Sequence, residues 1–356
     1  MSAGSQSPHS TRMRRSLTSI FPSPWRFLQT DSLTIEWHHP ILAGRDDKSR
    51  TAVHFEFVRI QIIYILERGM HGPIRMTANA YFRPRTVPEA VQALAASGGQ
   101  ILAGGTDFYP ALGDRPVRTP VVDVTSIREI QSIEFFPEEI HIGGGVTWTQ
   151  ILAARLPRAF DCLKLAAREV GSVQIQNRGT VAGNLCNASP AADGIPPLLA
   201  LDGSVELVSA AGTRRLALGE FVLGNRKTAR RAEEILTRVI VPREIEDAAS
   251  AFLKLGARRY LVISISMVAA IVARGTNGRV KAAHIAVGSC AARAQRLPKL
   301  ERELQGEEAR RGLGSIAMAE HLSPLSPIDD IRSTADYRRD ASLTLVRRAI
   351  EACVES

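Results

Sequence analysis

Apolar and polar positions follow short, changing periods over most of this 356-residue chain. Thr86 and Pro88 open a segment with helical spacing up to Leu94, because threonine caps helix N-termini and proline suits the first turn. An apolar strand at residues 100–103 then runs into a glycine turn and a helical turn at 111–112. The order of strand, glycine turn and helix predicts a mixed α/β region.

Similar patterns continue toward the C-terminus. Runs of β-branched residues bounded by turn residues predict strands, and apolar positions three or four apart predict helices. We expect strands at 121–124 and 139–143, a helix from Thr147, a hairpin pairing 203–209 with 215–218, strands at 263–273 and 280–288 joined by Asn277-Gly278, and helices at 294–305 and 338–353.

Charged and proline residues interrupt the apolar pattern at 242–248, which predicts a domain boundary. Residues 1–75 lack a clear period and are rich first in serine and arginine and then in aromatic residues. We interpret them as an atypical extension from a misassigned start, with Met70 or Met76 as the true one. The expected domains are therefore 76–242 and 243–356.

Composition favours a folded protein, since 45% of the residues are hydrophobic and 23% are charged. The formal charge of +9 comes from scattered arginines without interleaved aromatics, so we expect no nucleic-acid partner. Neither a signal peptide nor a membrane-spanning apolar run is found, which predicts a cytoplasmic protein without a membrane partner. The four cysteines are too dispersed for a metal or iron–sulfur site: Cys162, Cys186, Cys290 and Cys353.

Two glycine-rich segments, Ala103 to Asp107 and Asn177 to Asn184, have the composition of phosphate-binding loops. Glycine lets backbone N–H groups approach an anion, and threonine or asparagine adds donors. Either segment alone could equally be a tight turn, and neither matches GxGxxG or a Walker loop. No HExxH or GxSxG motif occurs, and His141 and His284 suit packed or surface positions, so we assign no catalytic residue.

The string GSVQIQNRGTVAGNLCNASPAAD, from Gly171 to Asp193, resembles the FAD-binding segment of molybdenum hydroxylase flavoproteins. That family includes the flavin domain of xanthine dehydrogenase and the medium subunit of carbon monoxide dehydrogenase. The similarity covers nearly everything from Phe82 onward. Further segments resemble the family in the same order: 103–107, 197–202, 233–236, 251–254, 326–332 and 335–338.

The resemblance implies an α+β fold, with a PCMH-type FAD-binding domain like that of vanillyl-alcohol oxidase and a smaller α+β C-terminal domain. It implies FAD held noncovalently, with Asp193 accepting from ribityl or ribose hydroxyls and Lys254 near the flavin. On generic grounds Asp193 could instead cap a helix and Lys254 could be a surface charge. The implied FAD-binding residues are Leu102, Ala103, Gly104, Gly105, Thr106, Asp107, Gly179, Thr180, Val181, Ala182, Gly183, Asn184, Asp193, Leu236 and Lys254.

The resemblance also implies a division of labour among subunits. A large partner would carry molybdopterin, a small partner would carry [2Fe–2S] clusters, and this chain would pass electrons from FAD to NAD⁺, oxygen or another acceptor. Many relatives have glycine where Ala182 stands, and the cysteine-rich insertion of hydroxybenzoyl-CoA reductase is missing here, which argues against an extra cluster.

Two alternatives stay open at this point. A self-sufficient flavin oxidase or dehydrogenase would need its own acid or base beside the flavin, and we find no candidate for that role. A scaffold subunit with a decayed flavin site would tolerate broken glycine loops, but both loops are intact.

Overall fold

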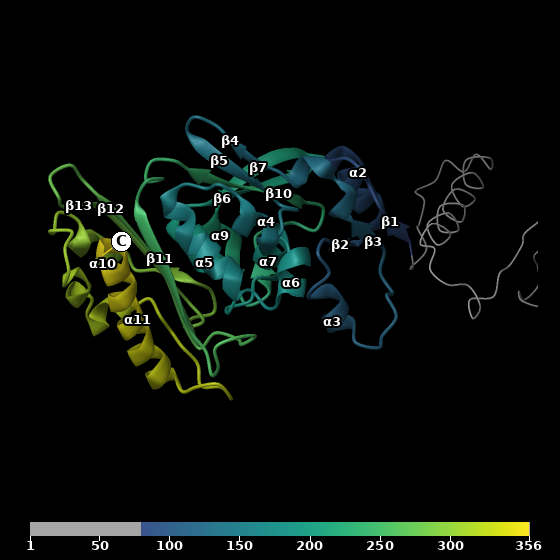
Figure 1. The fold of residues 1–356 in the computed structure, drawn as a ribbon. Coiled ribbons are helices and arrows are strands. Elements are labelled where there is room, and N and C mark those ends of the chain that lie inside the picture. The colour runs from purple at the N-terminus through teal and green to yellow at the C-terminus, as the bar shows by residue number, and fades with distance from the viewer. Residues whose placement is uncertain (1–79, 356) are drawn as a thin grey trace, which may run out of the picture. The chain divides into compact units, whose positions relative to one another are not determined.

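The computed structural model describes residues 80–355 (Figure 1). The chain divides into two units, Met1–Gly72 and Pro73–Ser356, and the described residues all belong to the second. The interpretation of residues 1–75 as an extension therefore lies outside the described residues. Within 80–355, no helix is long and apolar enough to cross a membrane.

The described chain begins with a small parallel sheet of order β1-β3-β2, formed by Tyr81–Phe82, Val121–Asp123 and Gln100–Leu102. Helix α2 (Val87–Ser97) packs beside it and starts as predicted, because the side chain of Thr86 accepts a hydrogen bond from the Glu89 amide. The helix ends at Gly98, whose φ of 60° suits a residue without a Cβ.

A five-stranded antiparallel sheet of order β4-β5-β10-β6-β7 forms the centre of the first half of the described chain, up to Pro242. Helices gather on one side of this sheet (Figure 1). The predicted strand at 139–143, the helix after Thr147 and the hairpin at 203–218 are confirmed. The strands are β4 (Ile133–Phe135), β5 (Glu139–Gly143), β10 (Ile235–Pro242), β6 (Ser204–Ser209) and β7 (Gly212–Ala217). The helices are α3 (Phe108–Leu112), α4 (Trp148–Ala153), α5 (Asp161–Glu169), α6 (Val173–Arg178), α7 (Val181–Asn187), α8 (Ile195–Ala200) and α9 (Leu218–Phe221).

A four-stranded antiparallel sheet follows, with the order β11-β12-β13-β14, and a two-stranded hairpin, β8-β9, precedes β10. The expected helix at 294–305 is shorter than predicted, because its first residues pair with β13 as strand β14. The elements are β8 (Val222–Gly224), β9 (Lys227–Thr228), β11 (Ala249–Leu255), β12 (Ser266–Arg274), β13 (Val280–Gly288), β14 (Gln295–Arg296), α10 (Pro298–Leu304) and α11 (Ala335–Glu355).

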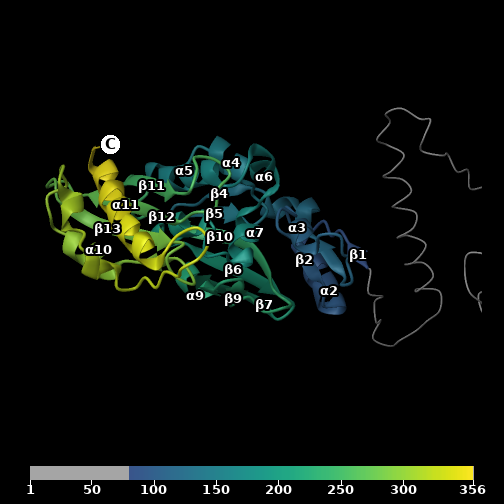
Figure 2. The ribbon, with the colours of Figure 1, turned by 90° about the horizontal axis from the view of Figure 1, so that it is seen from below.

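Strand β12 is buried on both of its faces. Met267, Ala269 and Ile271 belong to the core that the sheet shares with α5 and α8 of the first half. Val268 and Ala270 point the other way, into a core closed by α11, which crosses that face of the sheet (Figure 2). The C-terminal sheet is thus a middle layer, and the α+β architecture predicted from the sequence is confirmed.

Candidate functional site

The two glycine-rich segments lie directly against each other. A Cβ added to Gly104 would stand 1.9 Å from the backbone oxygen of Arg178, so only glycine permits this approach. On the other side, Trp148 N donates to Gly179 O at 3.2 Å and ties the second segment to α4. Segments more than 70 residues apart in the sequence thereby form one surface.

A third glycine segment, Gly143–Gly145, lies behind this surface and was missed by the sequence interpretation. Gly144 N donates to Thr237 O at 2.7 Å, and Gly144 O accepts from Ala182 N at 3.1 Å. A Cβ at Gly144 would stand 2.5 Å from Leu236 O. The run of three glycines was the available signal, and its role is to bring the start of α7 against β10.

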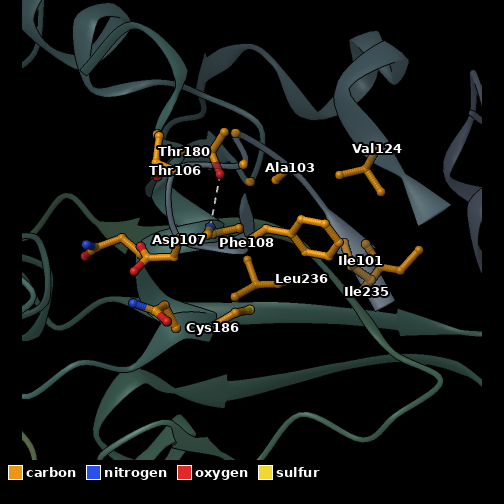
Figure 3. A pocket seen from close by; sticks show the side chains of 18 of the residues that line it. Ile101, Ala103, Thr106, Asp107, Phe108, Val124, Thr180, Cys186, Ile235 and Leu236 are labelled. Carbon is orange, nitrogen blue, oxygen red and sulfur yellow. Dashed lines mark hydrogen bonds between the residues drawn. The ribbon is translucent and has the colours of Figure 1, made fainter. Parts of the chain in front are cut away.

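The backbone donors of the two predicted loops differ in their availability. At the start of α7, the amides of Val181 and Ala182 donate to Val146 O and Gly144 O, so these donors are already used. The amide of Gly183 donates to Thr180 Oγ1 at 3.0 Å, the hydrogen bond that ends on Thr180 in Figure 3.

The first loop is different. Within the described part of the chain, no protein group accepts a hydrogen bond from the backbone N–H groups of residues 104–107. Gly105 has a φ of +76°, a left-handed conformation that turns the loop. Successive free N–H groups in a turn favour an anionic ligand, so this loop has the donors that a phosphate needs.

The loops enclose a cavity of ≈ 450 Å³ that also touches β10 and α7. Eleven of the fifteen residues expected to bind FAD line it: Ala103, Gly104, Gly105, Thr106, Asp107, Gly179, Thr180, Ala182, Gly183, Asn184 and Leu236. Leu102 and Val181 are instead buried beneath the loops, and Asp193 and Lys254 also lie outside the cavity wall. The cavity further includes residues not expected from the sequence, among them Gly144, Trp148, Cys186 and Arg230.

One wall of the cavity is apolar. Figure 3 shows the ring of Phe108 beside Ile101 and Ile235, with Val124 and Leu236 nearby. Burial raises the pKa of the Cys186 thiol to about 11, with Arg230 acting in the opposite direction, so the thiol stays protonated at neutral pH. An apolar wall facing free amides suits a ligand that combines an aromatic ring with phosphate.

The segment before β10 forms a further part of the wall and is fixed by two arginines. Arg230 Nη1 donates to Glu234 O at 2.7 Å and to Ala232 O at 3.2 Å. The buried carboxylate of Glu234 accepts two hydrogen bonds from Arg214, at 2.5 and 2.9 Å, and one from Arg231 N at 2.6 Å. These bonds, led by those from Arg214, lower the pKa of Glu234.

Asp193 and Lys254 form a separate buried cluster. Lys254 Nζ lies 2.7 Å from Asp193 Oδ2, and Ser264 Oγ donates to Asp193 Oδ1 at 2.8 Å. Burial raises the pKa of Asp193, while Lys254 and Ser264 act in the opposite direction. The side chain of Lys254 is only 6% exposed, so it is not a surface charge.

Comparison with known proteins gives the family. The domain described as "FAD binding domain in molybdopterin dehydrogenase" matches residues 75–244, and the "CO dehydrogenase flavoprotein C-terminal domain" matches residues 251–353. The chain is 30% identical over 274 residues to the 6-hydroxypseudooxynicotine dehydrogenase complex subunit alpha of Paenarthrobacter nicotinovorans, across 74% of this chain and 90% of that subunit. The chain belongs to the FAD-binding subunits of the molybdenum hydroxylases.

Other members of this family agree. The nicotinate dehydrogenase FAD-subunit of Eubacterium barkeri is 39% identical over 193 residues, which cover 52% of this chain but only 65% of that subunit. The solved structure of carbon monoxide dehydrogenase from Hydrogenophaga pseudoflava superposes with a TM-score of 0.72 at 25% identity, across 79% of this chain and 98% of the other. The family and the fold expected from the sequence are therefore confirmed.

The residues present fit FAD. The free amides at 104–107 suit its diphosphate, and the apolar wall suits a ring system. Asn184 Oδ1 is buried and has no hydrogen-bond partner among the described residues, so it can accept from a ligand donor. The cavity thus offers the donors, the acceptor and the apolar wall that FAD would need.

Proposed function

We propose that this chain is the electron-transfer subunit of a molybdenum hydroxylase complex, which takes electrons from [2Fe–2S] clusters on a small partner subunit. The substrate would be oxidised at molybdopterin on a large partner, and the electrons would leave to NAD⁺, oxygen or another acceptor. The observation that carries this proposal is the cavity between the two glycine loops, with its free backbone donors at 104–107.

In this proposal each part of the site has a separate task. The amides of residues 104–107 offset the charge of the FAD diphosphate, and Thr180 and Thr106 offer hydroxyl groups beside them. Asp193 is held by Lys254 and Ser264 outside the cavity wall. Its neighbour Gly194 packs against Trp148 and Asn184, which line the cavity. FAD, when bound, supplies the redox chemistry, since it can exchange electrons one at a time or in pairs.

The relatives are named as subunits or chains of larger enzymes, which supports the proposed partners. Their names give different substrates: nicotinate, 6-hydroxypseudooxynicotine and carbon monoxide. We therefore assign substrate choice to the molybdenum subunit. The four cysteines all lie in the described part of the chain and none forms a disulfide, which supports a location in the reducing cytoplasm.

The test compares the chain alone with the complex reconstituted from its two partners. The FAD-loaded chain should exchange electrons with a pyridine nucleotide or an artificial dye but should not oxidise purines, aldehydes or N-heteroaromatic acids. The reconstituted complex should couple oxidation of its substrate to dye reduction. Substrate turnover by the molybdenum-free chain would overturn the proposal in favour of a self-sufficient oxidase, and absence of FAD binding would indicate a scaffold.

A further inference from the structure

The loop between α7 and α8, residues 188–193, is held from the C-terminal domain. Pro190 O accepts a hydrogen bond from Ser289 N at 2.9 Å. At the other end of the loop, Asp193 Oδ1 accepts from Ser264 Oγ at 2.8 Å. Both anchors lie beside the C-terminal sheet, one just after β13 and the other just before β12.

A single buried guanidinium connects these anchors. Arg338, in the first turns of α11, is 3% exposed. Its Nη1 donates to Ser289 O at 3.2 Å and to the backbone oxygen of Ile265, the neighbour of Ser264, at 2.6 Å. Its Nη2 donates to Asp330 Oδ1 at 2.7 Å, which fixes the orientation of the guanidinium.

Backbone conformation adds a second observation. Ser289 has a φ of 64° and Ala188 a φ of 46°, a left-handed region that residues with a Cβ rarely adopt. Such conformations persist where the surroundings over-determine them. The amide of Ser289 is bound by Pro190 and its carbonyl by Arg338, so the strained residue is held from both sides.

We propose that Arg338 is a positioning residue for the FAD site, which sets the 188–193 loop, and with it Asp193, from the C-terminal domain. This inference rests on the proposed function, because it takes Trp148 and Asn184, which line the cavity and pack against Gly194 at the end of this loop, as contacts of FAD. A planar guanidinium can serve three acceptors at fixed angles, whereas the ammonium of lysine cannot reproduce that fork. The arrangement makes the C-terminal helix part of the cofactor site without contact to the cofactor.

The test uses Arg338→Lys in the full chain, with two measurements. FAD affinity is measured by titrating the apo chain, and backbone hydrogen exchange at 188–193 is measured without FAD. We expect FAD to bind about tenfold more weakly and the loop amides to exchange about tenfold faster, because about two hydrogen bonds are lost. The matched control is Arg347→Lys on the same helix, whose Nε donates to Ala317 O at 2.9 Å, and both values should stay within about twofold.

A double-mutant cycle with Ser264→Ala separates positioning from general loosening. If Arg338 acts through Ser264 and Asp193, the FAD affinity of the double variant should be close to that of whichever single variant binds FAD more weakly. Additive losses, unchanged loop exchange in Arg338→Lys, or an equal loss in Arg347→Lys would each overturn the inference. If the wild-type chain bound no FAD, the proposed function would fail, while the exchange comparison would still decide whether Arg338 holds the loop.

Discussion

At the scale of single residues, the site depends on backbone segments that approach each other so closely that no Cβ atom fits between them. Gly104 is the clearest case, because its Cα faces the carbonyl of Arg178 across the two loops. This close packing holds the first loop at the cavity, where the backbone N–H groups of residues 104–107 have no protein acceptor among the described residues. The glycine therefore acts through the distance between two segments rather than through its own flexibility.

We predict that Gly104→Ala weakens FAD binding by at least about tenfold, because the added methyl forces the loops apart. Fluorescence titration of the apo chain measures this effect. Gly224→Ala is the matched control, since nothing lies within 4 Å of a Cβ at that position. Equal affinity of the Gly104 variant and the wild type would show that the close approach of the loops does not shape the site.

At the scale of elements, the segment before β10 is a wall whose position depends on one buried carboxylate. Glu234 joins Arg214 on β7 to the amide of Arg231, and Arg230 closes the turn. Because the folded pKa of Glu234 is lowered, its stabilising effect is complete above its ordinary pKa of 4.5. That effect is lost as the pH falls from this value through the lower folded pKa.

We therefore predict that FAD release on acidification below about pH 4.5 is partly controlled by Glu234. Glu234→Gln should bind FAD more weakly at neutral pH. Its FAD affinity should also fall less steeply as the pH is lowered, because a neutral amide cannot lose this interaction by protonation. Flavin fluorescence against pH measures both effects. If FAD release from the variant depended on acid pH as steeply as release from the wild type, other carboxylates would control it.

Elements with local signals could be predicted from the sequence, whereas contacts between distant segments could not. The Thr86 cap and the 203–218 hairpin are specified by neighbouring residues, and both were predicted correctly. The roles of Gly144 and β14 were missed, because each depends on a partner far along the chain. The glycine loops of the site were found by composition and resemblance, but their contact at Gly104 needed the structure.

At the scale of the described unit, the C-terminal sheet serves two cores at once. Met267 and Ile271 complete the core of the FAD-binding half, and Val268 packs toward α11. The two regions that match family domains, 75–244 and 251–353, thus share a buried layer. Their stabilities should be coupled, because removing the sheet exposes apolar side chains of α5 and α8.

We predict that a chain ending at Pro242 is insoluble or fails to bind FAD, because the core above α5 and α8 loses its cover. The matched control is a chain starting at Met76, which keeps the sheet and should bind FAD like the full chain. Soluble yield and flavin absorbance check both. A soluble, FAD-binding fragment ending at Pro242 would show that the first domain is independent of the sheet.

The shared layer also has a consequence for synthesis. Helices α5 and α8 leave the ribosome before β12, which follows several seconds later at about 5–20 residues per second. During that interval the face that Met267 and Ile271 will cover has no partner, so the nascent chain presents an apolar surface to chaperones and to other chains. Because the C-terminal sheet is synthesised last, the cofactor-binding half can close its core only during the final third of translation.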